Sequence, residues 1–217
     1  MSYLEDVEFQ DNPDPRCPCL LLLDTSGSMS GAPIQALNQG LQTFQMDIVK
    51  DALAQRRVEV GIITFGNGGV RQIQDFVIAE NFQAPTLSAS GNTPMGEAIN
   101  RGIEMLRARK DQYKNHGIAY YRPWIFMITD GAPTDSWQAA AQGIESEESN
   151  KGLAFFAVGV ASANMNILSQ IAVRPPLMLQ GLNFVDLFLW LSQSQQRVSN
   201  SKIGEQTALP PPGWAVV

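Results

Sequence analysis

Apolar runs that end in polar or glycine-rich stretches divide the chain into alternating strands and helices. Runs that are apolar without alternation predict strands buried on both faces. Strands of this kind are predicted at residues 19–23, 58–65, 124–130 and 153–160, with a short last strand at 177–179. Apolar residues at near-helical spacing predict helices at 33–54, 94–109, 137–149, 164–171 and 183–198.

The order of these elements predicts the fold. Gly66-Asn67-Gly68-Gly69 is typical of a hairpin turn, and the β-branched residues from 70 to 78 indicate an antiparallel edge strand. Elsewhere strands alternate with helices, which favours parallel strand pairing. We therefore predict an α/β fold with a doubly wound, Rossmann-like and mostly parallel sheet, one antiparallel edge strand, and helices on both faces.

The two ends of the chain depart from this pattern. Residues 1–16 are polar and contain Pro13 and Pro15, so they predict an N-terminal arm. Residues 201–217 include three consecutive prolines, which favour an extended tail. The predicted domain itself spans 17–200. Trp214 in the tail could pack on its own domain or anchor a partner, and the sequence leaves both open.

Composition narrows the possible partners. The chain has 217 residues, 44% of them hydrophobic, which is enough for a core without disulfides. Its net charge of −6 argues against nucleic acid. No apolar run approaches the roughly 18 residues of a membrane helix, and the acidic N-terminus is unlike a secretory signal. Cys17 and Cys19 are badly spaced for a disulfide and are predicted to be buried, which favours the cytoplasm.

Two predicted central strands end in a carboxylate, at Asp24 and Asp130. In open α/β sheets, ligands bind beyond the carboxyl ends of the strands. If these two strands are adjacent, both carboxylates lie at one rim. Ser26 and Ser28 follow the first strand, and Thr93 lies in another polar loop. Two carboxylates and three hydroxyls form the all-oxygen set that Mg²⁺ prefers. Neutral hydroxyls offset little of a dication's charge, so an open coordination position would favour an acidic side chain from outside.

Each feature alone has a plainer explanation. An Asp at a strand end can cap the next helix or order a turn, and Thr93 before Pro94 can be a helix N-cap. Asp135 with Gln138 resembles a capping box, which favours an N-cap over an accessory metal ligand. The combination of all three motif loops is far more specific than any one of them.

Three segments carry a family resemblance: DTSGSM at 24–29, GNTPM at 91–95 and ITDG at 128–131. They resemble the metal-ion-dependent adhesion site (MIDAS) of von Willebrand factor A domains, over about residues 18–198. The resemblance implies direct metal binding by Ser26, Ser28 and Thr93. It implies that Asp24 and Asp130 bind the metal either directly or through a water molecule. The implied cation is Mg²⁺, with Mn²⁺ or Ca²⁺ as alternatives.

Further segments resemble a narrower group. DGAPTD at 130–135, FLWLS at 188–192 and LPPPGWA at 209–215 are similar to TerY-like proteins of bacterial tellurite-resistance and stress operons, which are intracellular. This resemblance implies an intracellular setting. Together with the open coordination position, the net negative charge and the lack of a long apolar run, it leads us to expect a cytoplasmic scaffold that binds a protein partner with an acidic side chain, and neither nucleic acid nor a membrane.

Three functions compete. The first is a cation-dependent protein-binding module without enzymatic activity. The alternative is a Mg²⁺-dependent phosphoryl-transfer enzyme, but Ser26 stands where such a site usually has a second acid, and there is no phosphate-binding GxxxxGK[ST] loop. The third is a structural protein with a vestigial metal site. We expect the first.

Overall fold

The computed structural model describes residues 9–66 and 68–216, with only the backbone of Val216, and these form a single seven-stranded sheet. The strand order is β3-β2-β1-β4-β5-β6-β7. Neighbouring strands are parallel except at the two edges, where β3 and β7 are antiparallel to their neighbours. The strands are β1 (Cys17–Thr25), β2 (Val58–Gly66), β3 (Gly69–Ile78), β4 (Trp124–Thr129), β5 (Ala154–Gly159), β6 (Leu177–Leu179) and β7 (Ala215–Val216).

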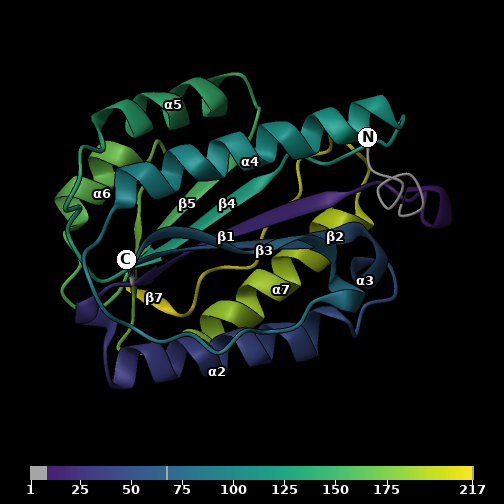
Figure 1. The fold of residues 1–217 in the computed structure, drawn as a ribbon. Coiled ribbons are helices and arrows are strands. Elements are labelled where there is room, and N and C mark those ends of the chain that lie inside the picture. The colour runs from purple at the N-terminus through teal and green to yellow at the C-terminus, as the bar shows by residue number, and fades with distance from the viewer. Residues whose placement is uncertain (1–8, 67, 217) are drawn as a thin grey trace.

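Helices cover both faces of the sheet (Figure 1). One face carries α2 (Ala32–Ile48), α3 (Ala54–Arg57) and α7 (Phe184–Asn200). The other carries α4 (Met95–Asn115), α5 (Gln138–Ser149) and α6 (Met165–Ile171). Two short 3₁₀ turns are η1 (Gly27–Met29) and η2 (Ala79–Asn81), and residues 9–11 are helical as well. The predicted fold class is confirmed.

The central strand β1 shows why its sequence is continuously apolar. Leu20 and Leu22 pack in the core beneath α4, whereas Leu21 and Leu23 pack in the core beneath α2 and α7. All four side chains are fully buried, since successive residues of a strand face opposite sides. The two cysteines of β1 are also buried, as predicted, and both thiols are free. Burial raises the pKa of the Cys19 thiol to about 12.

Two helix boundaries differ from the predicted ones. The helix predicted at 33–54 ends at Ile48, and Asp51 then accepts hydrogen bonds from the backbone N–H groups of Leu53 and Ala54, which starts the separate helix α3. The helix predicted to end at residue 109 continues to Asn115. Arg109 and Tyr113 are buried on the same side of this helix as its apolar residues. Because neither belongs to the apolar pattern from which the helix is predicted, the pattern places the end of the helix too early.

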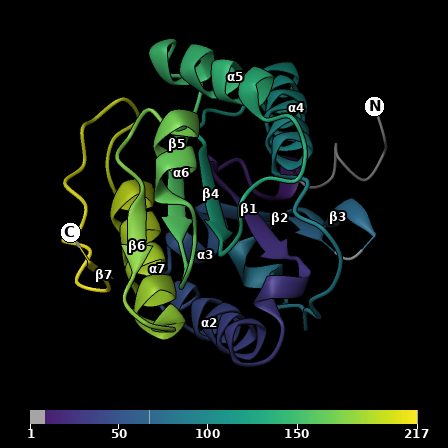
Figure 2. The same cartoon turned by 90° about the vertical axis from the view of Figure 1, so that its left-hand side faces the viewer.

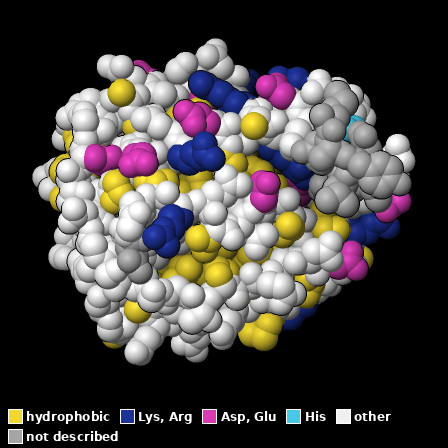
Figure 3. Space-filling model, in the orientation of Figure 1, with side chains coloured by type: hydrophobic (Ala, Val, Ile, Leu, Met, Phe, Trp, Pro, Cys, Tyr) yellow, Lys and Arg dark blue, Asp and Glu magenta, His cyan; other side chains and the backbone are white. Residues whose placement is uncertain are grey.

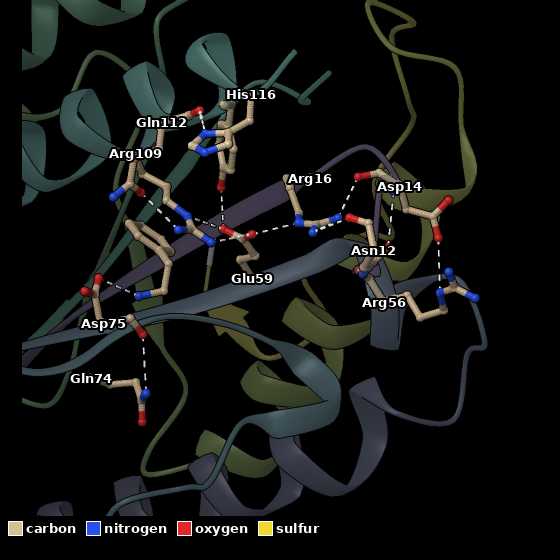
Figure 4. A network of polar contacts seen from close by, with 12 residues as sticks. Asn12, Asp14, Arg16, Arg56, Glu59, Gln74, Asp75, Arg109, Gln112 and His116 are labelled. Atoms are coloured by element: carbon tan, nitrogen blue, oxygen red, sulfur yellow. Dashed lines mark hydrogen bonds and ion pairs between the residues drawn. The ribbon is translucent and has the colours of Figure 1, made fainter. Parts of the chain in front are cut away.

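Buried ion pairs join the segment before β1, the start of β2 and helix α4 (Figure 4). Glu59 is fully buried and forms ion pairs with Arg16 at 2.9 Å and with Arg109 at 2.8 Å. The hydroxyl of Tyr113 also donates to Glu59. Arg16 donates in addition to the carbonyl of Asp14 at 2.6 Å. The last residues of the predicted N-terminal arm are thereby tied to the sheet, whereas residues 1–8 lie outside the described residues, as does Asn67 of the predicted turn.

The Pro-rich tail returns to the sheet, which the sequence did not predict. Trp214 is only 2% exposed, and its ring lies 5.6 Å from that of Trp190 in α7. The backbone carbonyl of Trp214 accepts a hydrogen bond from the N–H of Gln180, and the following two residues pair with β6 as β7. Of the two roles that the sequence left open for Trp214, the structure shows the first, since the side chain packs on its own domain.

Replacement of Trp214 by Ala should lower the free energy of unfolding by about 3–5 kcal/mol, because a fully buried aromatic ring is lost. Trp214→Phe should cost less, since it keeps a ring and removes an indole N–H that has no hydrogen-bond partner among the described residues. Urea unfolding of both variants measures this. A loss below about 1 kcal/mol for the Ala variant would mean that the tail is not docked.

Candidate metal centre

The two acidic strand ends lie at the point where the strand order reverses. β1 lies between β2 and β4, so the chain builds one half of the sheet to one side of β1 and the other half to the other side. Leu23 of β1 is in register with Ile128 of β4, which brings Asp24 and Asp130 to the same rim. Figure 2 views the molecule from this side. Ligands of open α/β sheets bind at such a switch point.

Asp24 is held by two hydrogen bonds and is fully buried. One carboxylate oxygen accepts from the backbone N–H of Ser26 at 2.8 Å, and the other accepts from the hydroxyl of Thr129 at 2.5 Å. Thr129 also accepts from the N–H of Gly131 at 3.2 Å. Sequence reasoning missed the role of Thr129, which orients Asp24 across the two strands, although the residue is part of the ITDG segment.

The two serines connect this carboxylate loop to Asp130. The 3₁₀ turn η1 places the hydroxyls of Ser26 and Ser28 3.0 Å apart. The hydroxyl of Ser28 then donates to a carboxylate oxygen of Asp130 at 2.6 Å. Ser26 is buried and Ser28 is exposed, so the group of oxygens opens to solvent on the Ser28 side.

Thr93 reaches the same place from the loop before α4. A Cβ atom on Gly131 would lie 3.2 Å from the hydroxyl oxygen of Thr93 and 3.7 Å from a carboxylate oxygen of Asp24. These two oxygens therefore border one small space, which the missing side chain of Gly131 leaves free. All five residues predicted for the site are thus brought together, from three loops that are far apart in the sequence.

Asp135 has a role that differs from both interpretations of its sequence. Its two carboxylate oxygens accept hydrogen bonds from the backbone N–H groups of Gly96 at 3.0 Å and Glu97 at 2.8 Å. It therefore caps the N-terminus of α4, and the predicted capping box with Gln138 is wrong, since α5 has Trp137 at its N-cap without a side-chain cap. Both oxygens are engaged, which also speaks against an accessory metal ligand.

The same capping leaves Thr93 available. The N-cap position of α4 is Pro94, which has no side chain able to cap, and Asp135 supplies the cap from another loop. The backbone N–H of Thr93 donates to the hydroxyl of Thr134 at 3.0 Å, and the Thr93 carbonyl accepts from the N–H of Thr134 at 2.9 Å. The loop is therefore fixed through its backbone, and the hydroxyl of Thr93 is not needed as a helix cap.

The carboxylates at this rim lack a cationic partner in the part of the chain that the structure describes. Burial raises the pKa of Asp24, its hydrogen bonds with Ser26 and Thr129 lower it in part, and the nearby charge of Asp130 raises it further. Within residues 9–66 and 68–216, no Lys, Arg or His side chain forms an ion pair with either carboxylate. A bound dication would offset this repulsion.

The donor set fits a hard divalent cation. Two carboxylates and three hydroxyls offer only oxygen, which Mg²⁺ and Ca²⁺ prefer. In the described part of the chain, no group of three or more His, Cys, Asp or Glu side chains could hold a metal ion. At this rim the hydroxyls would therefore have to complete the coordination together with water, as in sites that keep several water ligands.

Comparison with known proteins agrees with this arrangement. The family model of the von Willebrand factor type A domain matches residues 20–186. Among solved structures, the pilus adhesin SpaC from Lactobacillus rhamnosus GG is 17% identical with a TM-score of 0.69, covering 84% of this chain and 30% of that one. The SpRpn10 VWA domain is 13% identical with a TM-score of 0.57, covering 79% of this chain and 95% of that one.

A third similar structure is described with a bound metal. Proximal thread matrix protein 1 from the mussel byssus, described with a zinc-occupied MIDAS motif, is 17% identical with a TM-score of 0.51. The match covers 85% of this chain and 48% of that protein. At these identities the likeness shows the fold alone, and the chain spans less than a third of the adhesin. A search of curated proteins gave no significant match.

The raised pKa of Asp24 predicts a pH dependence of stability. In EDTA, the free energy of unfolding of the wild type, relative to that of Asp24→Asn, should fall as the pH rises. The protonated carboxyl is favoured in the folded state, so its contribution is complete below the usual pKa of 3.8 and is lost as the pH passes the raised value. Urea unfolding between about pH 4 and 8 measures the difference.

Mg²⁺ provides an internal control for this prediction. Binding requires ionised carboxylates, so the stabilisation by Mg²⁺ should grow over the same pH range. A difference between wild type and Asp24→Asn that stays constant or rises with pH in EDTA would contradict the proposed environment of Asp24.

Proposed function

The chain belongs to the von Willebrand factor type A family, and from this we propose that it is a divalent-cation-dependent protein-binding module. The observation that carries the proposal is the group of five oxygen-bearing side chains at the switch point of the sheet, which includes two carboxylates without a cationic partner among the described residues. The side chains are Asp24, Ser26, Ser28, Thr93 and Asp130.

We assign the cation contacts as follows. Ser26, Ser28 and Thr93 bind the ion directly, and Asp24 and Asp130 bind it directly or through water. Mg²⁺ is the proposed ion, with Mn²⁺ and Ca²⁺ as alternatives, because all donors are oxygen. The zinc-occupied motif of the mussel protein supports a divalent ion at this position of the fold.

The proposed partner is a protein that supplies an acidic side chain. Neutral hydroxyls leave most of the positive charge of the ion unbalanced, and the exposed Ser28 marks the side from which a carboxylate can approach. A net charge of −6 disfavours nucleic acid. Among the described residues no helix is both long and apolar enough to span a bilayer. The setting that we propose is a cytoplasmic scaffold in a bacterial stress or tellurite-resistance system, which rests on the TerY-like segments alone.

Cation binding by the isolated protein tests the site. Asp24→Ala, Ser26→Ala and Thr93→Ala should each weaken Mn²⁺ binding in isothermal titration by at least about tenfold, because each removes a proposed ligand or its support. Ser30→Ala is the matched control, since this exposed serine lies in the same loop and its hydroxyl donates to the carbonyl of Ala89. Equal affinities of Asp24→Ala and the control would exclude the assignment.

Partner capture tests the function. Affinity purification with wild-type protein should retain a partner in Mg²⁺ and release it in EDTA, whereas Asp24→Ala should retain none in either buffer. Circular dichroism of Asp24→Ala checks that the fold is intact. Capture that persists both in EDTA and with Asp24→Ala would contradict a metal-dependent interaction.

We propose that the protein is not an enzyme. In a phosphohydrolase site of the aspartate type, a second acid two residues after the nucleophile is usual, and Ser26 occupies that position. We expect no hydrolysis of small phosphate esters above the buffer rate in Mg²⁺. Turnover that disappears in Asp24→Ala would favour the phosphoryl-transfer alternative instead.

A further inference from the structure

A groove leads away from the candidate metal centre between β3 and α4. Its first part, a hollow of about 360 Å³, is bordered by the loop residues on either side of Thr93 and by the start of β3. Its second part, of about 610 Å³, continues along β3 and the exposed side of α4. The two hollows adjoin, because neighbouring residues of the chain border them. Gly69 borders the first and Val70 the second, and likewise Thr134 borders the first and Asp135 the second.

One wall of the groove is an edge strand that is regular for only four residues. β3 pairs with β2 in unbroken register from Gly69 to Gln72. Beyond that point the register shifts twice, at residue 73 and again at residues 75–76, as expected for bulges that end regular pairing. Near the second shift, Asp75 accepts a hydrogen bond from the N–H of Phe76 at 2.8 Å. The regular stretch thus coincides with the part of β3 that borders the groove.

This stretch has no second neighbour among the strands of the described residues, since β3 is the end of the sheet. An exposed regular edge is a template for an added extended segment, which pairs through its backbone. Four residues of strand correspond to about 13 Å. The site is therefore suited to a short extended segment and not to a helix or a long strand.

The other wall of the groove carries an excess of negative charge. Its charged side chains among the described residues are Glu97, Glu104 and Asp135 against Arg101, and Arg71 of β3, whose guanidinium lies beside Gly68, adds a second cation on the opposite wall. Arg101 lies 3.7 Å from Glu104, and both side chains are more than half exposed. In Figure 3, acidic and basic side chains lie next to one another over the N-terminal part of α4, above a strip of hydrophobic side chains. An incoming basic group would find more carboxylates than cations here.

We propose that this groove binds a short extended segment of the partner that carries both charges. Its acidic residue reaches the metal, and a Lys or Arg further along the segment binds the carboxylates of Glu97 and Glu104, in competition with the exposed ion pair of Arg101 with Glu104. The inference rests on the proposed function, since it assigns the partner's chemistry beside the metal. From Met95 to Arg101 the helix rises about 9 Å, which an extended chain spans in about three residues. The basic residue should therefore follow or precede the acidic one by three to four positions.

Selection from a phage-displayed library of random peptides, about twelve residues long, tests the proposal without knowledge of the partner. On wild-type protein in Mg²⁺, the enriched sequences should contain an Asp or Glu with a Lys or Arg three to four positions away. On Glu97→Gln/Glu104→Gln the acidic residue should persist and the basic preference should be lost. The matched control is Glu80→Gln/Glu145→Gln, which removes two exposed carboxylates outside the groove and should select as wild type does.

A synthetic peptide of the enriched sequence then gives the magnitude by fluorescence polarisation. Glu97→Gln/Glu104→Gln should weaken its binding roughly threefold to tenfold at low salt, as expected for exposed ion pairs. Neutralising the basic residue of the peptide should weaken binding to the wild type equally and have little further effect on the double variant. Mn²⁺ affinity of the double variant should be unchanged.

The outcomes separate the two proposals. Enriched peptides with an acidic residue but no basic residue at a fixed spacing, or a basic preference that survives in Glu97→Gln/Glu104→Gln, would overturn the groove and leave the metal-dependent function intact. An absence of any enrichment that depends on Mg²⁺ and on Asp24 would instead overturn the proposed function.

Discussion

β1 and β4 pair in parallel at the centre of the sheet. This pairing places Asp24 and Asp130 at one rim of the sheet and packs both strands between two layers of helices. Burial then deprives Asp24 of water, and Asp130 adds repulsion. Thr129 and the serine turn bind these carboxylates by hydrogen bonds but supply no positive charge. A bound cation would therefore offset the negative charge of these two carboxylates.

The opposite end of the same sheet shows the other solution to a buried carboxylate. Glu59 lies at the start of β2 and is balanced by two guanidinium groups of the chain itself, from Arg16 and Arg109. A buried charge that is paired on both sides can be structural, whereas removing a partner would leave a costly isolated charge. At Glu59 the chain supplies cations to a buried carboxylate, so the lack of such cations beside Asp24 and Asp130, among the described residues, is particular to that rim of the sheet. Positive charge is provided internally at one end and, in our account, by a bound ion at the other.

The sequence predicted much of this because the relevant signals are local. The continuous apolar run of β1 predicts a central strand, and the three motif segments place hydroxyls and carboxylates at strand ends. What it could not predict depends on contacts between distant segments. Asp135 looks like a cap for its own helix, yet the fold brings it to the N-terminus of α4. β7 has two residues, and it follows Trp214, which packs beside Trp190 of a distant helix. Arg109 continues a buried stripe because Glu59 neutralises it, which no apolar periodicity can reveal.

We propose that one divalent ion binds among five side chains, and anomalous diffraction can locate this ion. Crystals grown with Mn²⁺ should show one strong anomalous peak at the rim of β1 and β4, within coordination distance of hydroxyl oxygens of Ser26, Ser28 and Thr93 and next to the carboxylates of Asp24 and Asp130. A map at saturating Mn²⁺ with no peak there, or with its only strong peak elsewhere on the molecule, would contradict the account.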